Sequence, residues 1–398
     1  MSARSCRRLI AVALLSIASC GVALTGSALA AKPSVDSATA RRLVLAVQRV
    51  MSKRSMPGAI VGVQRDGRPP WIIARGVANL LTRQPMRSDE HMRIGSVTKS
   101  FVTTLLLQLA QARRLSLDDP ISRYVAGVPG GDAITLRQLA NMTAGLADPS
   151  LNPDFAIPFY TNEPFTPTQL VGLGLGLPPL FTPGTKWSYS NTNTDLLGLV
   201  IEKVTGQPLA VALRQRVFGP LGLTGTSLPS VSAMPRPYAN GYTIQTITKA
   251  LGDATLYTPT LTWAAGGVVS TVRDLLRAAP MFGTGRPLLS KATQRERTRW
   301  VGLPPNSPIQ QYGVGVFSFN GWIGHNGGIP GYTAIAWYLP KLRLSLVVSV
   351  NSDIGPERTG YAYEPASDIA HSLTQILSPQ NLAPVYVKVG GSRVTTVN

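Results

Sequence analysis

Gly95-Ser96-Val97-Thr98-Lys99 opens a helix that the sequence predicts over residues 96–112. Apolar residues recur at helical spacing and give this helix a face to bury: Phe101, Val102, Leu105, Leu106 and Leu109. Because positions i and i+3 share one side of a helix, the amine of Lys99 reaches the hydroxyl of Ser96. A cation in the first turn opposes the helix dipole, which indicates that Lys99 has a role beyond helix stability.

The Ser-x-x-Lys pair has the chemistry of an activated nucleophile. A lysine buried at a helix start among other cations is pushed towards its neutral, basic form and then accepts the proton of the serine hydroxyl. The backbone N–H of Ser96 points out of the first turn, where it can stabilise an oxyanion. The alternative is that Ser96 caps the helix and that Lys99 is a solvated first-turn residue.

The sequence on both sides of this helix predicts an α+β fold. Strand patterns are found at residues 58–64, 71–77, 314–319, 332–338 and 344–350, with a hairpin turn at Asp66-Gly67. Helix patterns are found at residues 36–53, 135–139, 195–204 and 363–377. We expect one antiparallel sheet flanked by helices and shared by the two ends of the chain, with an inserted α-rich subdomain and a cleft between the two parts.

The predicted domain limits follow the changes in pattern. We expect a signal peptide over residues 1–30, one domain over 31–380 and a flexible tail over 381–398. Within that domain the α/β part covers about 36–114 and 258–380, and the α-rich insertion covers about 115–257. The run Gly172-Leu173-Gly174-Leu175-Gly176 resembles a phosphate loop but lacks a preceding strand, so we interpret it as a loop or a weak helix.

The first thirty residues have the pattern of an export signal. Three arginines, Arg4, Arg7 and Arg8, precede an apolar stretch over residues 9–24, and Ala28-Leu29-Ala30 provides a cleavage site. We therefore expect a secreted or extracytoplasmic protein of the cell envelope. The alternative is a lipoprotein attached through Cys20, but the residues after Cys20 stay apolar.

Composition excludes several classes of function. The 398 residues are 44% hydrophobic and carry a formal charge of +19, yet no basic run is interleaved with aromatic residues, so we expect no nucleic-acid partner. A diffuse positive charge instead favours association with an anionic cell envelope. The two cysteines lie within the first twenty residues and the three histidines are widely spaced, so we expect no metal site and no cofactor.

A second candidate element is Tyr189-Ser190-Asn191, which lies between the turn at Pro183-Gly184 and a predicted helix. A phenolate beside a protonated lysine serves as a general base, and an asparagine amide can orient both the lysine and a substrate carbonyl. The Tyr-x-Asn spacing also occurs at Tyr160 and Tyr238. The turn and the helix favour Tyr189, because they fix its loop on both sides.

A third candidate element is Gly324-His325-Asn326-Gly327-Gly328. Glycines beside a strand edge let a ligand approach the backbone, so a substrate can add there as an extra strand. The alternative is an ordinary turn with a surface histidine. The other two histidines, His91 and His371, are interpreted as structural or exposed.

Together these residues resemble the penicillin-recognising serine hydrolases, a family of class C β-lactamases, D-alanyl-D-alanine carboxypeptidases and related esterases. The resemblance rests on Ser96-x-x-Lys99, Tyr189-x-Asn191 and His325-x-Gly327 in this order, and it covers about residues 40–378. It implies that Ser96 is the acylated nucleophile and that Lys99 and Tyr189 share proton transfer.

The resemblance also implies the substrate-binding residues. Asn191 is expected to hold the lysine and the substrate amide, and His325 occupies a position where relatives carry Lys or His. The backbone N–H groups of Ser96 and Gly328, next to Gly327, are expected to form the oxyanion hole. Asn326 stands where relatives often have a Thr or Ser that binds a substrate carboxylate, and no arginine lies just upstream.

Three functions remain open from the sequence. The first is an exported serine hydrolase that acts on a small molecule or a peptidoglycan peptide, as a D-alanyl-D-alanine carboxypeptidase or by β-lactamase-like amide hydrolysis of a β-lactam. The second is an esterase or lipase that uses the same Ser-Lys-Tyr site. The third is a non-catalytic binder of peptidoglycan or β-lactams, which an intact Ser96, Lys99 and Tyr189 set argues against.

Overall fold

An eight-stranded antiparallel sheet of order β2-β1-β12-β11-β10-β9-β8-β7 forms the centre of the fold. The computed structural model describes residues 32–156, 162–303, 310–355, 364–384, 387–389 and 393–395. The strands of the sheet are β1 (Gly58–Arg65), β2 (Trp71–Gly76), β7 (Val301–Gly302), β8 (Gln311–Tyr312), β9 (Phe317–Phe319), β10 (Trp322–Ile329), β11 (Tyr332–Leu339) and β12 (Leu344–Val350). Strand β1, from the first part of the chain, pairs with β12, from the last part.

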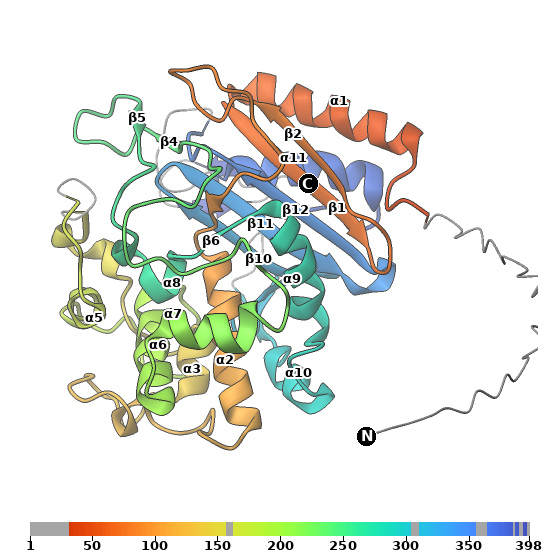
Figure 1. Cartoon of the computed structure of the whole chain (residues 1–398). Helices are drawn as coiled ribbons and strands as arrows, with labels where there is room; N and C mark the ends of the chain where they lie inside the picture. The colour runs from red at the N-terminus through yellow and green to blue at the C-terminus, as the bar shows by residue number, and fades with distance from the viewer. Residues whose placement is uncertain are drawn as a thin grey trace, which may run out of the picture. The chain divides into compact units, whose positions relative to one another are not determined.

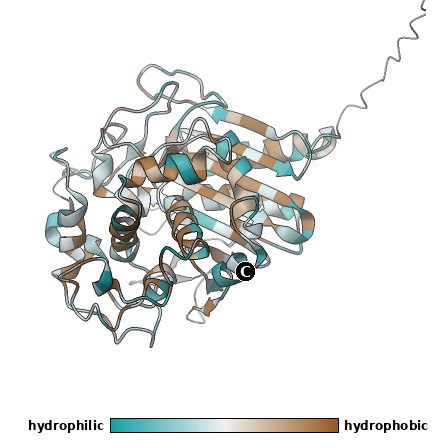
Figure 2. Cartoon of the chain, turned by 60° about the horizontal axis from the view of Figure 1, so that its bottom comes forward, coloured by the Kyte–Doolittle hydropathy of each residue, from teal (hydrophilic) through white to brown (hydrophobic). Residues whose placement is uncertain are grey.

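Alternation along these strands sends side chains into two separate cores. On β11, Ala334 and Ala336 belong to one core, and Ile335 and Trp337 to the other. Strand β12 alternates in the same way, so both faces of the sheet are covered. Figure 2 shows helices with hydrophobic residues on one side and hydrophilic residues on the other.

Helices cover the two faces of the sheet unequally. The helices are α1 (Ser37–Arg54), α2 (Val97–Gln111), α3 (Leu136–Ala140), α5 (Pro167–Leu175), α6 (Asn191–Thr205), α7 (Leu209–Leu213), α8 (Trp263–Gly266), α9 (Val272–Thr284), α10 (Lys291–Arg297) and α11 (Pro365–Leu377). α1 and α11 pack together against one face, and α9 packs on the other face (Figure 1). α2 contacts β10, α6 and α8, and so joins the sheet to the helical part of the chain.

Short elements complete the described chain. The 3₁₀ turns are η1 (Ile121–Arg123), η2 (Pro149–Leu151), η3 (Pro153–Ala156), η5 (Pro259–Leu261) and η6 (Pro340–Leu342), and a π-helical turn, η4, covers Arg214–Phe218. Four two-residue strands form two small ladders: β3 (Met92–Arg93) with β6 (Val269–Ser270), and β4 (Tyr242–Thr243) with β5 (Gly252–Asp253).

The fold expected from the sequence is confirmed, and its elements differ from the prediction in a few places. Strand β9 begins at Phe317 rather than residue 314, because Gly315 takes a left-handed backbone conformation with φ +67° and turns the chain. The glycine run 172–176 lies largely in α5. Strand β10 and helix α9 were not predicted as such.

The two ends of the chain are described only in part. The predicted signal peptide lies outside the described residues. The predicted tail lies partly outside them, and its described parts are residues 381–384, β13 (Val387–Val389) and β14 (Arg393–Thr395). The two strands pair with each other. Within the described part of the chain, no single helix is long and apolar enough to span a membrane, and one pair that passes by length and composition, Asn191–Thr205 with Leu209–Phe218, is bent by 79°.

Candidate active site

Ser96 lies immediately before α2, at the point where the helix meets the sheet. Its backbone is helical, and its side chain makes no capping hydrogen bond, so the hydroxyl is not used to cap the helix. Gly95 precedes it with φ +49°, a conformation that side chains rarely adopt. The first turn is held from outside by Thr98, whose hydroxyl accepts a hydrogen bond from the Val268 N–H at 3.1 Å.

Lys99 is fully buried on the first turn of α2. Its Nζ donates to Oγ of Ser96 at 3.0 Å, to Oδ1 of Asn191 at 2.7 Å and to the Ala265 carbonyl at 2.7 Å. An ammonium has three donors, so these bonds use all of them. The predicted meeting of Ser96, Lys99 and Asn191 is therefore present in the structure.

Burial sets the charge of Lys99. It lowers the pKa of the Lys99 amine to about 7, although the negative charges of Asp195 and Asp148 act to raise that pKa. Asp195 is buried on α6, one turn after Asn191, and burial raises its pKa, against the attraction of Lys99. A lysine with a pKa near neutrality exchanges its proton readily with a serine hydroxyl.

Tyr189 reaches the same place from a tight loop. The N–H groups of Gly184 and Ser188 donate to the carbonyls of Thr143 and Met142, which fixes the loop at the Pro-Gly turn and just before Tyr189. The Tyr189 ring centroid lies 4.8 Å from Nζ of Lys99. Burial raises the pKa of Tyr189 well above its ordinary value, although Ser96 lies close enough to lower it by hydrogen bonding. The site thus favours the neutral hydroxyl over the phenolate that the sequence suggested.

Strand β10 supplies the edge that faces Ser96. β9 pairs with β10 only over Trp322–Gly324, so the described strands leave the stretch from His325 to Ile329 unpaired on that side. A Cβ built on Gly327 would stand 2.7 Å from N of Ser96, and one on Gly95 would stand 2.9 Å from N of Gly328. The backbones of the two predicted oxyanion residues, Ser96 and Gly328, therefore lie side by side.

His325 is buried beside these residues rather than exposed to solvent. Its Nδ1 lies in hydrogen-bond contact with the Asn326 carbonyl, and its Nε2 lies 3.3 Å from the Tyr312 hydroxyl. This pattern fits a neutral ring with the proton on Nδ1 and with Tyr312 as donor to Nε2. Burial lowers the pKa of His325 to about 3, so the ring is uncharged near neutral pH.

Asn326 faces a carboxylate of the protein itself. Its Nδ2 donates to both Oε1 and Oε2 of Glu364, each at 2.7 Å. Glu364 precedes α11, and burial raises its pKa, against the hydrogen bonds from Asn326 and Ser367. The position expected to bind a substrate carboxylate is thus next to an acidic group.

Sequence reasoning missed three residues of this site. Asp195 follows Asn191 at i+4, a spacing that places it on the same helix face, and this was the available signal. Tyr312 lies in a Tyr-Gly-Val-Gly stretch, where no local pattern marked it as a site residue. Glu364 lies far from the other motifs in sequence, and nothing local distinguished it.

The remaining candidates lie elsewhere. Nδ1 of His91 and of His371 lies within hydrogen-bond distance of a backbone carbonyl, at 2.8 and 2.6 Å, as expected for structural residues. Tyr238 pairs through its neighbours with His91, and Tyr160 lies outside the described residues. No group of three His, Cys, Asp or Glu residues among those described is arranged to hold a metal ion.

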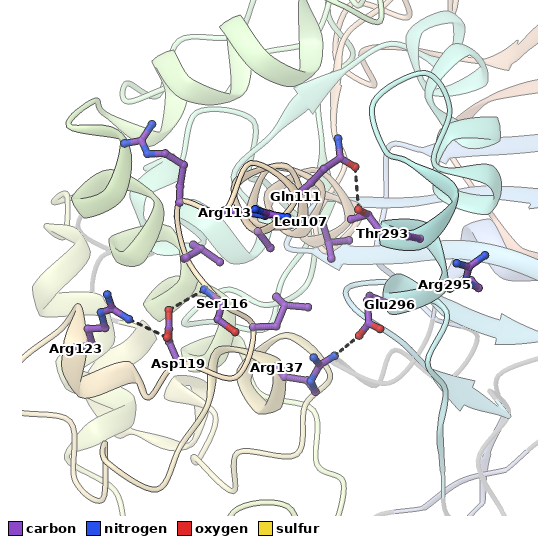
Figure 3. A pocket seen from close by; sticks show the side chains of 15 residues that line it. Leu107, Gln111, Arg113, Ser116, Asp119, Arg123, Arg137, Thr293, Arg295 and Glu296 are labelled. Carbon is purple, nitrogen blue, oxygen red and sulfur yellow. Dashed lines mark hydrogen bonds and ion pairs between the residues drawn. The ribbon is translucent and has the colours of Figure 1, made fainter.

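A cavity of about 690 Å³ lies at the other end of α2 (Figure 3). Its lining includes several arginines, but Arg123 bonds Asp119 and Arg137 bonds Glu296. None of the predicted site residues lines it. This cavity is therefore separate from the Ser96 site.

Comparisons with known proteins agree with this geometry. Residues 43–370 match the family described as Beta-lactamase. A D-stereospecific amidohydrolase from Streptomyces sp. is 35% identical, with a TM-score of 0.72 over 80% of this chain and 95% of that one. A beta-lactamase from Lysobacter lactamgenus is 29% identical over 68% of this chain, and Esterase EstB from Burkholderia gladioli is 31% identical over 52% of it.

The curated relatives are matched only in part, since the matched region spans 66% of the Lysobacter protein and 56% of the Burkholderia protein. The family match itself extends from α1 into α11 and includes Ser96, Tyr189 and His325. The chain therefore belongs to the Beta-lactamase family of penicillin-recognising serine hydrolases.

Proposed function

We propose that the protein hydrolyses amide bonds through an acyl-enzyme on Ser96. The observation that carries this proposal is the Lys99 amine, which is bonded to Oγ of Ser96 at 3.0 Å and whose pKa burial lowers to about 7. The relatives support it, because one is titled a D-stereospecific amidohydrolase and another a beta-lactamase.

The reaction proceeds in two halves. Neutral Lys99 accepts the Ser96 proton while Oγ attacks the substrate carbonyl, and the N–H groups of Ser96 and Gly328 stabilise the oxyanion. The C–N bond then breaks, and the protonated Lys99–Tyr189 pair returns a proton to the leaving amine. Water, deprotonated by the same pair, attacks the acyl carbonyl, releases the acid and restores the Ser96 hydroxyl.

Within this chemistry the sequence favours a D-alanyl-D-alanine carboxypeptidase or β-lactamase-like amide hydrolysis. Ester hydrolysis is the second candidate, because the same residues break a C–O bond and because the esterase from Burkholderia gladioli is a relative. A non-catalytic binder is the weakest reading, since Lys99 gains nothing from burial unless its basicity is used.

Acylation of Ser96 is the decisive test. Wild type, Ser96→Ala and the control Ser122→Ala, an exposed serine on η1, are incubated with fluorescent penicillin and with p-nitrophenyl esters of N-acyl-D-alanine. We expect turnover by wild type and the control, none by Ser96→Ala, and an acyl mass on the peptide that contains Ser96. If wild type neither takes the label nor hydrolyses any activated ester, both hydrolase proposals are wrong.

The two enzyme activities and the binder separate in the same assay. Ester turnover without penicillin labelling favours the esterase, and a label that never turns over favours the binder.

We also propose export to the cell envelope, supported by the signal pattern over residues 1–30. A cytoplasmic location with an intact N-terminus by mass spectrometry would contradict export.

A further inference from the structure

Glu364 occupies an unusual place beside the reaction centre. Its carboxylate accepts hydrogen bonds from Asn326 on β10 and from the Ser367 hydroxyl at 3.2 Å. A Cβ built on the exposed Gly328 would stand 3.9 Å from Oε1 of Glu364. The carboxylate therefore lies next to the unpaired edge of β10, where a substrate backbone is expected to lie.

Within the described part of the chain, no cation balances the charge of Glu364. Among the described residues, no lysine, arginine or histidine forms an ion pair with it, and its hydrogen bonds come from neutral groups. Its field reaches the hydroxyl of Tyr189, which places it within electrostatic range of the proton-transfer groups. Each carboxylate oxygen accepts more than one hydrogen bond, so the group retains capacity for a further donor.

This arrangement acts on the charge of a substrate. A substrate carboxylate next to β10 meets Glu364 at short range in a partly buried site, where like charges repel strongly. An ammonium group in the same place gains a charge-assisted hydrogen bond. The amide of Asn326 does not offset the repulsion, because both Oε atoms of Glu364 already accept from its Nδ2.

We propose that Glu364, held by Asn326, is a specificity residue that makes this site prefer substrates with an ammonium group beside the scissile bond and disfavour substrates with a carboxylate there. The preferred class is amides or esters whose leaving group carries an ammonium. Acyl peptides that end in a carboxylate, and β-lactams, carry their carboxylate on that same side of the scissile bond and belong to the disfavoured class. The inference thus narrows the amide hydrolysis proposed above away from the carboxypeptidase and β-lactamase activities. This inference rests on the proposed hydrolysis through Ser96.

Two matched pairs of substrates test the preference at pH 7, below the usual pKa of a primary alkylamine. The first pair is the 2-aminoethylamide and the propylamide of N-acetyl-D-alanine, which compares an ammonium with a neutral group on the leaving amine. The second pair is N-acetyl-D-alanyl-D-alanine and its C-terminal amide, which compares a carboxylate with a neutral group. The readout is the ratio of kcat/KM within each pair, for wild type and for variants of Glu364.

We expect wild type to turn over the ammonium substrate faster than its neutral partner, and the neutral amide faster than the carboxylate. Glu364→Gln should reduce both preferences, each taken as favoured over disfavoured substrate, by about 10-fold or more, the effect of one charge-assisted hydrogen bond. Glu364→Asp should restore the direction of both preferences. Glu296→Gln, whose carboxylate bonds Arg137 at the separate cavity, should leave both ratios at the wild-type value. A general loss of folded protein lowers kcat/KM for both substrates of a pair by the same factor, so it leaves these ratios unchanged.

The outcomes separate the two proposals. Turnover of all substrates without preference, or with the same preference in Glu364→Gln, overturns the role of Glu364 and leaves the Ser96 chemistry intact. Absence of any turnover, together with no acyl mass on Ser96, refutes the proposed hydrolase and the preference with it. Circular dichroism of each variant confirms that the compared proteins are folded.

Discussion

The backbone of Gly327 lies so close to the backbone of Ser96 that no side chain fits between them. A Cβ on Gly327 would stand 2.7 Å from N of Ser96 and 2.1 Å from the Ile94 carbonyl. The edge of β10 therefore packs directly against the backbone of the nucleophile. The geometry of the predicted oxyanion hole depends on this close packing, which is possible because Gly327 has no Cβ.

Replacing Gly327 with alanine should separate β10 from the start of α2. The new methyl group clashes with backbone atoms, which cannot rotate away as side chains do, so we expect a loss of about 1–3 kcal/mol in the free energy of unfolding. The displaced N–H groups should lower kcat by about 100-fold or more.

Gly172→Ala is the matched control for this substitution. It lies in α5, and a Cβ there meets nothing within 4 Å. Kinetics and urea unfolding of both variants check the prediction. Wild-type kcat in Gly327→Ala would show that the contact does not position the reacting groups.

Removal of the Tyr189 hydroxyl should affect catalysis far more than stability. The oxygen is buried and lies within hydrogen-bonding reach of Ser96, and the described residues show no bond from it to the surrounding fold. Tyr189→Phe therefore removes a proton carrier without breaking a bond that holds the fold together. We expect kcat to fall by about 100-fold or more. Tyr238→Phe changes a tyrosine away from the site and should retain activity. Equal losses in the two variants would show that Tyr189 is the wrong tyrosine.

The pH dependence of kcat/KM should follow the deprotonation of the Lys99 amine. Its pKa is lowered to about 7, so the base is neutral above that value and protonated below it. Activity should therefore rise as pH increases through about 7. Burial raises the pKa of Tyr189 well above its ordinary value, so its hydroxyl stays protonated and causes no loss up to pH 9. A profile measured from pH 5 to 9 that falls, or that stays flat, contradicts neutral Lys99 as the base.

Much of the fold followed from sequence because its signals are local. α1 begins after Asp36, whose carboxylate caps the helix, and α2 begins after Ser96, where the apolar spacing indicated a helix. β12 covers Leu344–Val350 as predicted, since a short apolar run between turns allows few other structures. β10 was harder, because its glycines resemble a turn and only pairing with β11 makes the stretch a strand.

The site was predictable only where motifs are short. Ser96 and Lys99 are one helical turn apart, so their contact follows from helix geometry alone. Asn326 and Glu364 are separated by 38 residues, and their contact depends on how α11 packs against β11. The predicted carboxylate-binding role of Asn326 lacked this information, since no local pattern indicates which side chain will face it.

Glu90 carries the last prediction, which concerns stability. The residue is 1% exposed, and burial raises its pKa to about 7, outweighing the backbone N–H of Arg87. Between the ordinary pKa of 4.5 and about 7 the folded state therefore binds more protons than the unfolded state, so stability is lost as pH rises through this window. Glu90→Gln removes this titration.

The difference in Tm between Glu90→Gln and wild type should thus be more positive at pH 8 than at pH 5. Asp154→Asn, which removes an exposed acid on η3, serves as the control. Thermal unfolding followed by circular dichroism at the two pH values measures the effect. A difference that is equal at both, or larger at pH 5, would mean that the Glu90 carboxylate is ionised at no cost in the folded protein, and that its surroundings supply a partner for the charge.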